Sequence, residues 1–503
     1  MTREKKLMLN SLTSIIYQLV TMVCGFILPR MFLTHFGSEV NGLVSSITQF
    51  LGFISLAECG VGAVVQSTLY VPLAKKDNVE ISKIFISSEK FFKKILYLLT
   101  GYIIVLIVVF PFITNSNFGW GYTSLLIFIL SINTFAQYYL GMTYRLILNA
   151  DQYGFVQYLL NIVTLIINTI CCVILITMGS SIHVVKGVSA IIFLIQPIVL
   201  VLYAKKRYKI DKTIKLTEEP IKQKWNGFAQ HIATVVLNNT DTVVLTILST
   251  LKMVSVYSVY YLVINGVTQL TRSATNGIQA MFGNMLAKGE MQELKERYDR
   301  FEWLMHTLVV VIFMSTALLI VPFALVYTKG VTDTNYNVPI FAYLITLAQA
   351  TYCLRLPYNI MILAAGHYKE TQQSAIIEAI LNVIISVALV YKFDLIGVAI
   401  GTFIAMAYRT IYFVIYLSNN IIERKVKYFN KQLFVDFLTV IVIIGITKLC
   451  HNIFVIKELT YISWVILAIK IFLLVVMVSF VVNLIFYNKR INIILNKQSK
   501  EEK

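Results

Sequence analysis

Charged side chains interrupt several long apolar runs of this sequence, and they are the residues best placed to do chemistry. Six of them lie well inside such runs: Glu58, Asp241, Arg272, Arg355, Glu378 and Arg409. An ionisable group at membrane depth is costly and usually faces a cavity, an ion pathway or a partner of opposite charge. Guanidinium groups bind phosphate and carboxylate through paired hydrogen bonds. The arginines therefore predict anion binding, and Asp241, Glu58 and Glu378 are the candidates for coupling transport to proton or sodium entry.

Some of these charges also have a structural interpretation. Glu58 and Arg272 are 214 residues apart, the offset that relates other segments below, and a structural ion pair between them stays open. Arg30 stands at the outer end of the first apolar run and Arg145 at the inner end of the fourth. Long side chains at such places can extend to lipid headgroups. For Arg145 we favour that interpretation, whereas Arg30 is also a candidate for substrate binding.

Amide and hydroxyl groups beside aromatic rings could bind a sugar. The fourth apolar run carries Gln137 and Tyr144, two helical turns apart on one face, and the tenth carries Gln349 and Tyr352, three residues apart. Asn239 in the seventh run offers a similar amide. Hydrogen bonds between helices and aromatic packing are the alternative explanation for each of them.

The composition places these residues in a membrane. Of 503 residues, 58% are hydrophobic and 14% are charged, whereas soluble domains have about 45–50% apolar and about 25% charged residues. In a soluble protein the net charge of +18 would suggest a nucleic-acid partner. Here the basic residues gather between apolar runs, as in 205–215, where they suit anionic lipid headgroups. We therefore expect anionic phospholipids at the cytoplasmic face as partners, and no nucleic acid.

The sequence predicts no cofactor, no metal and no enzyme. No pair among the six cysteines has metal-ligand spacing, and the chain contains no P-loop pattern. A membrane glycan polymerase or acyltransferase is the enzyme that we considered. Such an enzyme would carry catalytic Arg or His on a large external loop, whereas the outer loops predicted here are short.

The apolar runs predict an all-α polytopic protein, since a spanning helix needs about 20 mostly apolar residues. Fourteen helices are expected at about 8–33, 40–67, 95–114, 121–148, 154–178, 187–204, 225–249, 254–285, 302–326, 338–364, 370–391, 395–417, 432–449 and 460–487. With the N-terminus inside, the outer loops receive only these basic residues: Lys186, Lys252, Lys329, Lys392 and Lys457. Because positive charge stays in the cytoplasm, both termini are predicted to be cytoplasmic.

Four segment pairs recur in the same order at offsets of 211–215 residues. The pairs are 36–40 with 250–254, 110–112 with 321–323, 134–137 with 346–349, and 150–153 with 365–368. Such self-similarity predicts a duplicated six-helix unit. The expected domains are an N-terminal lobe at 1–210, a C-terminal lobe at 211–424, and two added helices with a basic cytoplasmic tail at 425–503. Transporters built from such repeats hold substrate at the repeat interface and alternate access by rocking.

Several segments resemble the polysaccharide-type, Wzx-like branch of the multidrug/oligosaccharidyl-lipid/polysaccharide exporter superfamily. The segments are 36–50, 56–62, 69–74 and the Asn/Asp-bearing stretch 238–245. The resemblance covers essentially the whole chain. It implies a V-shaped pair of six-helix lobes plus two extra helices in a bacterial cytoplasmic membrane. It also implies a flippase that moves a polyprenyl-diphosphate-linked oligosaccharide, a surface polysaccharide precursor, to the outer leaflet.

For such a flippase, Arg30, Arg272, Arg355, Arg409, Asn239, Gln137 and Gln349 are the predicted substrate-binding residues. We expect a monomer, with a glycan polymerase as the protein partner that such a pathway suggests. Two other transporters share this architecture. A multidrug or metabolite cation antiporter would need an acidic cavity, and a peptidoglycan lipid-precursor flippase would use the same mechanism.

Overall fold

The computed structural model describes residues 3–58, 61–114, 118–214, 216, 221, 228–275 and 277–501, and every regular element in them is a helix. The parts of the predictions above that lie outside the described residues include 59–60 within the segment 56–62, Lys215, 225–227 at the start of the seventh predicted span, 276 within the eighth, and 502–503 at the end of the predicted third domain. Ten of the described helices are long and apolar enough to cross a membrane. The chain is therefore a multi-pass membrane protein.

The predicted count of fourteen spans stays a prediction, because several predicted spans do not appear as separate long apolar helices. The predicted first and second spans fall within one candidate, Glu4–Glu58, although two helices meet inside it at Gly37. The predicted spans at 225–249, 254–285 and 338–364 are covered by helices that are shorter, broken or less apolar. The last of these breaks at Arg355, and Pro357 follows directly in the next helix. Polar side chains inside these spans thus make them less apolar than typical membrane helices without removing the helices.

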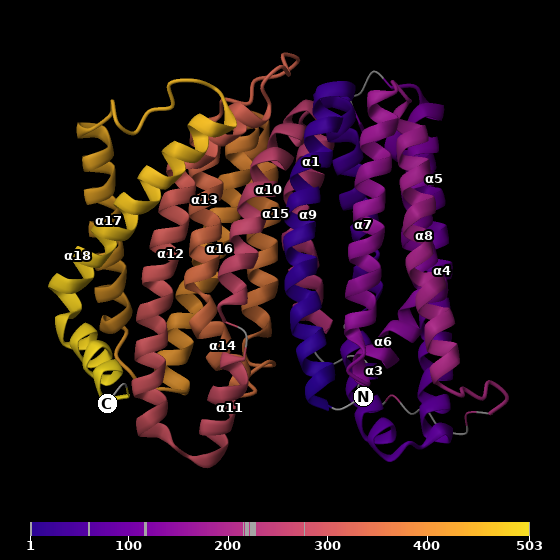
Figure 1. Cartoon of the computed structure of the whole chain (residues 1–503), viewed down its shortest axis with the longest axis horizontal. Helices are drawn as coiled ribbons and strands as arrows, with labels where there is room; N and C mark the ends of the chain where they lie inside the picture. Colours follow the sequence, from indigo (N-terminus) through magenta and orange to yellow (C-terminus); the bar gives the residue numbers. More distant parts are fainter. Residues whose placement is uncertain are drawn as a thin grey trace. The chain divides into compact units, whose positions relative to one another are not determined.

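The chain forms two compact units, and each is described by itself. Unit 1 comprises residues 1–258 and 331–334, and unit 2 comprises 259–330 and 335–503. The helices of unit 1 are α1 (Arg3–Gly52), α2 (Ser55–Glu58), α3 (Val61–Lys75), α4 (Asn78–Ile113), α5 (Trp120–Ala136), the π-helix η1 (Gln137–Gly141), α6 (Met142–Ala150), α7 (Gly154–Thr177), α8 (Ile182–Arg207), α9 (Phe228–Leu248) and the start of α10 (Leu251–Ser273) (Figure 1). The predicted domain ends at 210 and 424 stay predictions.

Two helices meet within α1 at Gly37, which leaves the helical conformation. Gly37 has a φ of 79°, a conformation that side chains disfavour. The backbone N–H and the hydroxyl of Ser38 then each donate a hydrogen bond of 2.7 Å to the carboxylate of Asp333. These bonds satisfy a buried polar residue at the bend. The predicted turn between the first two spans therefore coincides with the break between two helices at Gly37.

The neighbouring Asn41-Gly42 pair has a packing role in unit 1. The amide of Asn41 donates to the hydroxyl of Ser255 at 2.8 Å. A Cβ atom at Gly42 would lie 1.8 Å from the carbonyl oxygen of Leu251, so only glycine permits this approach of α1 to α10. This part of the family-like segment 36–50 therefore holds helices together within unit 1.

Unit 2 contains the rest of α10, α11 (Ile278–Lys288), α12 (Met291–Tyr327), α13 (Pro339–Leu354), α14 (Leu356–Ala364), α15 (Gln372–Phe393), α16 (Leu395–Asn420), α17 (Lys427–Leu449) and α18 (Tyr461–Glu501). The last two helices pack beside α12 (Figure 1). Buried Trp303 on α12 donates its indole N–H to Asn483 of α18 at 2.7 Å. These two helices are therefore an integral part of unit 2.

Candidate functional site

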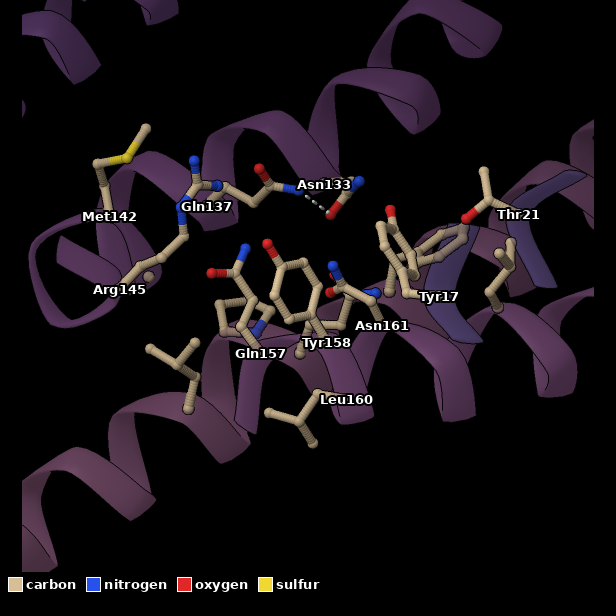
Figure 2. Close-up of a pocket in the computed structure, with 16 residues that line it drawn as sticks. Tyr17, Thr21, Asn133, Gln137, Met142, Arg145, Gln157, Tyr158, Leu160 and Asn161 are labelled. Atoms are coloured by element: carbon tan, nitrogen blue, oxygen red, sulfur yellow. Dashed lines mark hydrogen bonds between the residues drawn. The ribbon is translucent and has the colours of Figure 1, made fainter. Parts of the chain in front are cut away.

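A pocket of about 480 Å³ lies inside unit 1, among α1, α5, η1, α6, α7 and α8. Its volume falls in the range of small-molecule sites, about 300–1,000 Å³. Polar side chains from these helices line it: Tyr17, Thr21, Asn133, Gln137, Arg145, Gln157, Tyr158, Asn161 and Gln196. Five of these are carboxamides, and Arg145 is the one charged residue among the described lining residues. Figure 2 shows Arg145, Gln157 and Tyr158 directed toward the same space.

The π-helix η1 decides which residues of the fourth predicted span face the pocket. A π turn takes about one residue more than an α turn, so two turns that include η1 take about eight residues. Gln137 and Arg145, eight apart, therefore both line the pocket. Tyr144, predicted on the face of Gln137, is buried against the ring of Phe85 instead. Inserted π turns occur frequently at functional sites.

Several polar side chains of this pocket have no hydrogen-bond or ion-pair partner among the residues that the structure describes. In the described part of the chain, the side chains of Arg145, Gln157 and Asn161 make no hydrogen bond or ion pair. Gln137 makes one weak hydrogen bond of 3.4 Å, to Asn133. Figure 2 shows that bond as a dashed line between the two side chains. These donors and acceptors are free to bind a ligand.

Two tyrosines add an aromatic wall beside these amides. The rings of Tyr17 on α1 and Tyr158 on α7 have centroids 5.8 Å apart. Both line the pocket and are half-buried. Aromatic faces beside amides and a guanidinium can bind the polar edges and the apolar faces of a saccharide at the same time.

Three of the predicted charged residues meet in unit 2, in a dry ionic triad. The Nη1 atom of Arg355 lies 2.5 Å from Oε1 of Glu378, and the Nη1 atom of Arg409 lies 2.7 Å from Oε2. All three side chains are at most 8% exposed. Gln349 is also buried, on α13. The two guanidinium groups are thus neutralised in part by one shared carboxylate.

The other predicted residues are placed separately. Arg30 is half-buried on α1, and Arg272 is exposed at the end of α10. Asn239 donates to its own helix, at the carbonyl of Val235, and Asp241 is buried and accepts from Tyr257 at 3.0 Å.

Glu58 accepts a hydrogen bond from Tyr138 of η1. Because Glu58 and Arg272 belong to different units, their predicted ion pair stays a prediction.

Sequence reasoning missed a second charged cluster in unit 2. It comprises Asp299, Glu302, His306, Arg424 and Asp436, and is held by hydrogen bonds of 2.5–2.7 Å. The spacing of Glu302 and His306, four apart on a helix, was the signal that could have found it. No group of His, Cys, Asp and Glu among the described residues could hold a metal ion.

No protein-family model and no curated protein matches this chain. Solved structures do match. A structure of the lipid II flippase MurJ in an inward closed conformation is 17% identical, with a TM-score of 0.69, and the match covers 96% of this chain and all of that one. An inward-facing multidrug resistance MATE transporter is 14% identical, with a TM-score of 0.59 and coverage of 79% and 95%.

The MATE multidrug transporter DinF-BH is 13% identical, with a TM-score of 0.52 and coverage of 84% and 98%. At such low identities these likenesses concern the fold, and they say nothing of the ligand. The chain therefore has the helical fold that MurJ and the MATE transporters share.

Proposed function

We propose that this protein is a flippase of the polysaccharide type, which moves a polyprenyl-diphosphate-linked oligosaccharide from the inner to the outer leaflet. The guanidinium of Arg145 supports this function most directly. It has no hydrogen-bond or ion-pair partner among the described residues, and five carboxamides line the pocket around it. The pocket would hold part of the polar head of the substrate while its polyprenyl tail stays in the bilayer.

An unpaired cation among apolar helices needs an explanation. Burying a charge without a partner costs several kcal/mol, as an order of magnitude. Such residues persist where they serve binding or transport. Arg145 is half-buried and faces carboxamides, which cannot neutralise it. A phosphate or a sugar carboxylate entering the pocket would supply the missing negative charge through paired hydrogen bonds.

The predicted repeat supports this interpretation, because corresponding residues of the two units make different interactions. At an offset of 212 residues Gln137 corresponds to Gln349, and at 213 Gln196 corresponds to Arg409. In unit 2 Arg409 belongs to a buried ionic triad, which has its own carboxylate in Glu378. On the proposed duplication, one copy keeps a ligand pocket and the other fills the same region with an internal ion pair.

In this mechanism the two repeats alternate access to the two sides of the membrane. The head enters from the cytoplasmic side, where basic loops and anionic lipids meet, and leaves at the outer leaflet. We place the protein in a bacterial cytoplasmic membrane with both termini inside. Arg30, Arg272 and Asn239 remain proposed contacts along the path, and a glycan polymerase remains the proposed receiver of the product.

A test follows the substrate in cells. A strain that lacks the protein should accumulate lipid-linked oligosaccharide on the inner leaflet and lose surface polymer. Restoring the full chain should reverse both effects, and an Arg145→Gln chain should reverse them only in part. Normal surface polymer without any accumulation in the deleted strain would contradict the proposal.

A second candidate is a peptidoglycan lipid-precursor flippase, which is favoured by the fold match to a lipid II flippase over the full length of that chain. It needs the same pocket chemistry. The two are separated by the identity of the accumulated lipid, which mass spectrometry of the extracted lipids would give. A cation exporter is disfavoured because no acid lines the pocket among the described residues, and the absence of dye efflux would agree with that.

A further inference from the structure

The cluster of charges that sequence reasoning missed lies in unit 2, where α12 and α17 meet the link between α16 and α17. Its acids are Asp299 and Glu302 on α12 and Asp436 on α17. His306 of α12 places Nδ1 at 2.5 Å from Oδ2 of Asp436. The side chain of His306 is 2% exposed and that of Asp436 is 15% exposed. None of these residues belongs to the pocket or to the ionic triad.

His306 and Asp436 are hydrogen-bonded to each other, and the other strong hydrogen bonds of the cluster involve Arg424. Arg424 donates to Asp299 at 2.5 Å and to both oxygens of Glu302 at 2.6 and 2.7 Å. Tyr358 of α14 donates to the same Glu302 carboxylate. Arg424 is thus engaged with Glu302 and Asp299. The Nε2 atom of His306 is buried and has no hydrogen-bond partner among the described residues.

The charges of the cluster do not balance without a proton on this pair. The carboxylates of Glu302 and Asp436 face the one guanidinium of Arg424, which also pairs with the more exposed Asp299, so this largely buried place carries excess negative charge. A proton on the histidine–aspartate pair offsets that charge, and buried excess charge is costly. The other described side chains that face the cluster are uncharged: Tyr298, Tyr358, Tyr428, Phe429 and Gln432.

We propose that His306 and Asp436 together form a proton-binding site that controls how firmly α17 is held on α12. With the proton bound between Nδ1 and Oδ2, the two helices are joined by a charge-assisted hydrogen bond. When the proton leaves to water through the partly exposed Asp436, the carboxylate charge of Asp436 is no longer balanced by His306, while Gln432 of the same helix contacts the buried Glu302. The repulsion between these carboxylates then loosens α17.

Loosening α17 would also affect α18. Both helices share one apolar cluster with α12, including Val435 of α17 and Ile471 of α18. The proton would therefore act on the pair of helices that follows the proposed repeat. This inference goes beyond the proposed function and holds for any substrate, so the failure of one leaves the other standing.

The first measurement needs no variant. Exchange of the imidazole C2 hydrogen for deuterium in the full chain, measured by mass spectrometry at a series of pH values, reports the titration of each histidine-containing peptide. We expect the exchange rate of the His306 peptide to change with pH, as the gain and loss of a proton by its imidazole requires. Half-buried His367, which bonds to Tyr416 in the same unit, is the internal reference. A His306 that holds one protonation state throughout would overturn the proposal.

The second measurement follows α17 itself. Backbone amide exchange in 427–449, corrected for intrinsic rates, should be several-fold faster at pH 8 than at pH 6. His306→Gln should abolish this difference, and His367→Gln should preserve it. Asp436→Asn is the second variant if His306→Gln fails to fold, and it should also abolish the difference. A pH effect on α17 that survives either substitution, or is absent from the unsubstituted protein, would overturn the proposal.

Discussion

Replacing Arg145 by glutamine removes the one charged side chain that lines the pocket of unit 1 among the described residues. The substitution keeps a polar group of moderate length beside Gln137 and Gln157. Because Arg145 makes no hydrogen bond or ion pair within the described residues, its loss should leave the fold intact. It should even remove the cost of a charge without an internal partner. Ligand binding, in contrast, should suffer directly.

The size of the loss follows from the bonds that a guanidinium makes to an anion. A hydrogen bond to a charged group contributes about 1.5–3 kcal/mol, and about 1.4 kcal/mol is a factor of ten in affinity. One paired contact between Arg145 and an acidic group therefore predicts about ten- to hundredfold weaker binding in Arg145→Gln. Arg145→Lys retains the charge without the planar fork, so its loss should be smaller.

The assay is native mass spectrometry of the purified chain with lipid-linked oligosaccharide extracted from the deleted strain. Surface polymer in complemented cells gives a second readout. Arg297→Gln is the matched control, since that arginine is 51% exposed and pairs with Glu293, and such surface pairs contribute about 0–1 kcal/mol. If Arg145→Gln folds normally and binds the lipid as tightly as the control does, the pocket does not recognise an anion and the reasoning fails.

Two further predictions concern stability and can be measured as thermal unfolding in detergent. Glu378→Gln should destabilise unit 2 by about 3–5 kcal/mol, because it leaves two buried guanidinium groups without their carboxylate; an unchanged midpoint would show that these charges are not buried together. Gly42→Ala should cost at least about 1–3 kcal/mol, since its Cβ would clash with the carbonyl oxygen of Leu251. Gly101→Ala, in a helix position with no atom within 4 Å, is the control and should be neutral or stabilising; equal effects of the two substitutions would refute the packing argument.

Much of the helical architecture could be predicted from apolar runs, because a helix that satisfies its own backbone is the structure that a membrane permits. The contacts that fix the connections between helices are harder to predict. The turn predicted after Phe36 coincides with a break between two helices at Gly37, which adopts a positive φ while Ser38 binds Asp333. That hydrogen bond joins residues 295 apart in the sequence, so no local sequence pattern predicts it.

The candidate site was predicted only in part. Gln137 was named, but Arg145 was assigned to lipid headgroups and Tyr144 to the sugar-binding face. An α-helical count of residues leads to that choice, and the π turn at Gln137–Gly141 reverses it. Glu378 was named as an acid for ion coupling, yet it lies 23 and 31 residues from the two arginines that it binds. Separations of that kind are set by packing between helices, which one sequence does not display.

The arginines of the two units differ in whether a carboxylate balances their charge, and this difference indicates the kind of ligand that unit 1 binds. In unit 2 the guanidinium of Arg409 has a carboxylate at 2.7 Å from α15, so its charge is balanced within the protein. In unit 1 the guanidinium of Arg145 shares its pocket with amides and hydroxyls, and with no acid among the described lining residues. If the units arose by duplication, Arg409 and Glu378 correspond to Gln196 and Thr164 of unit 1, an uncharged hydrogen-bonded pair. Arg145 is then an additional charge of that pocket, and we infer that its counter-charge comes from the ligand. The ligand of unit 1 is then an anion whose other groups suit carboxamides and aromatic rings, which describes an acidic or phosphorylated sugar better than it describes a cationic drug.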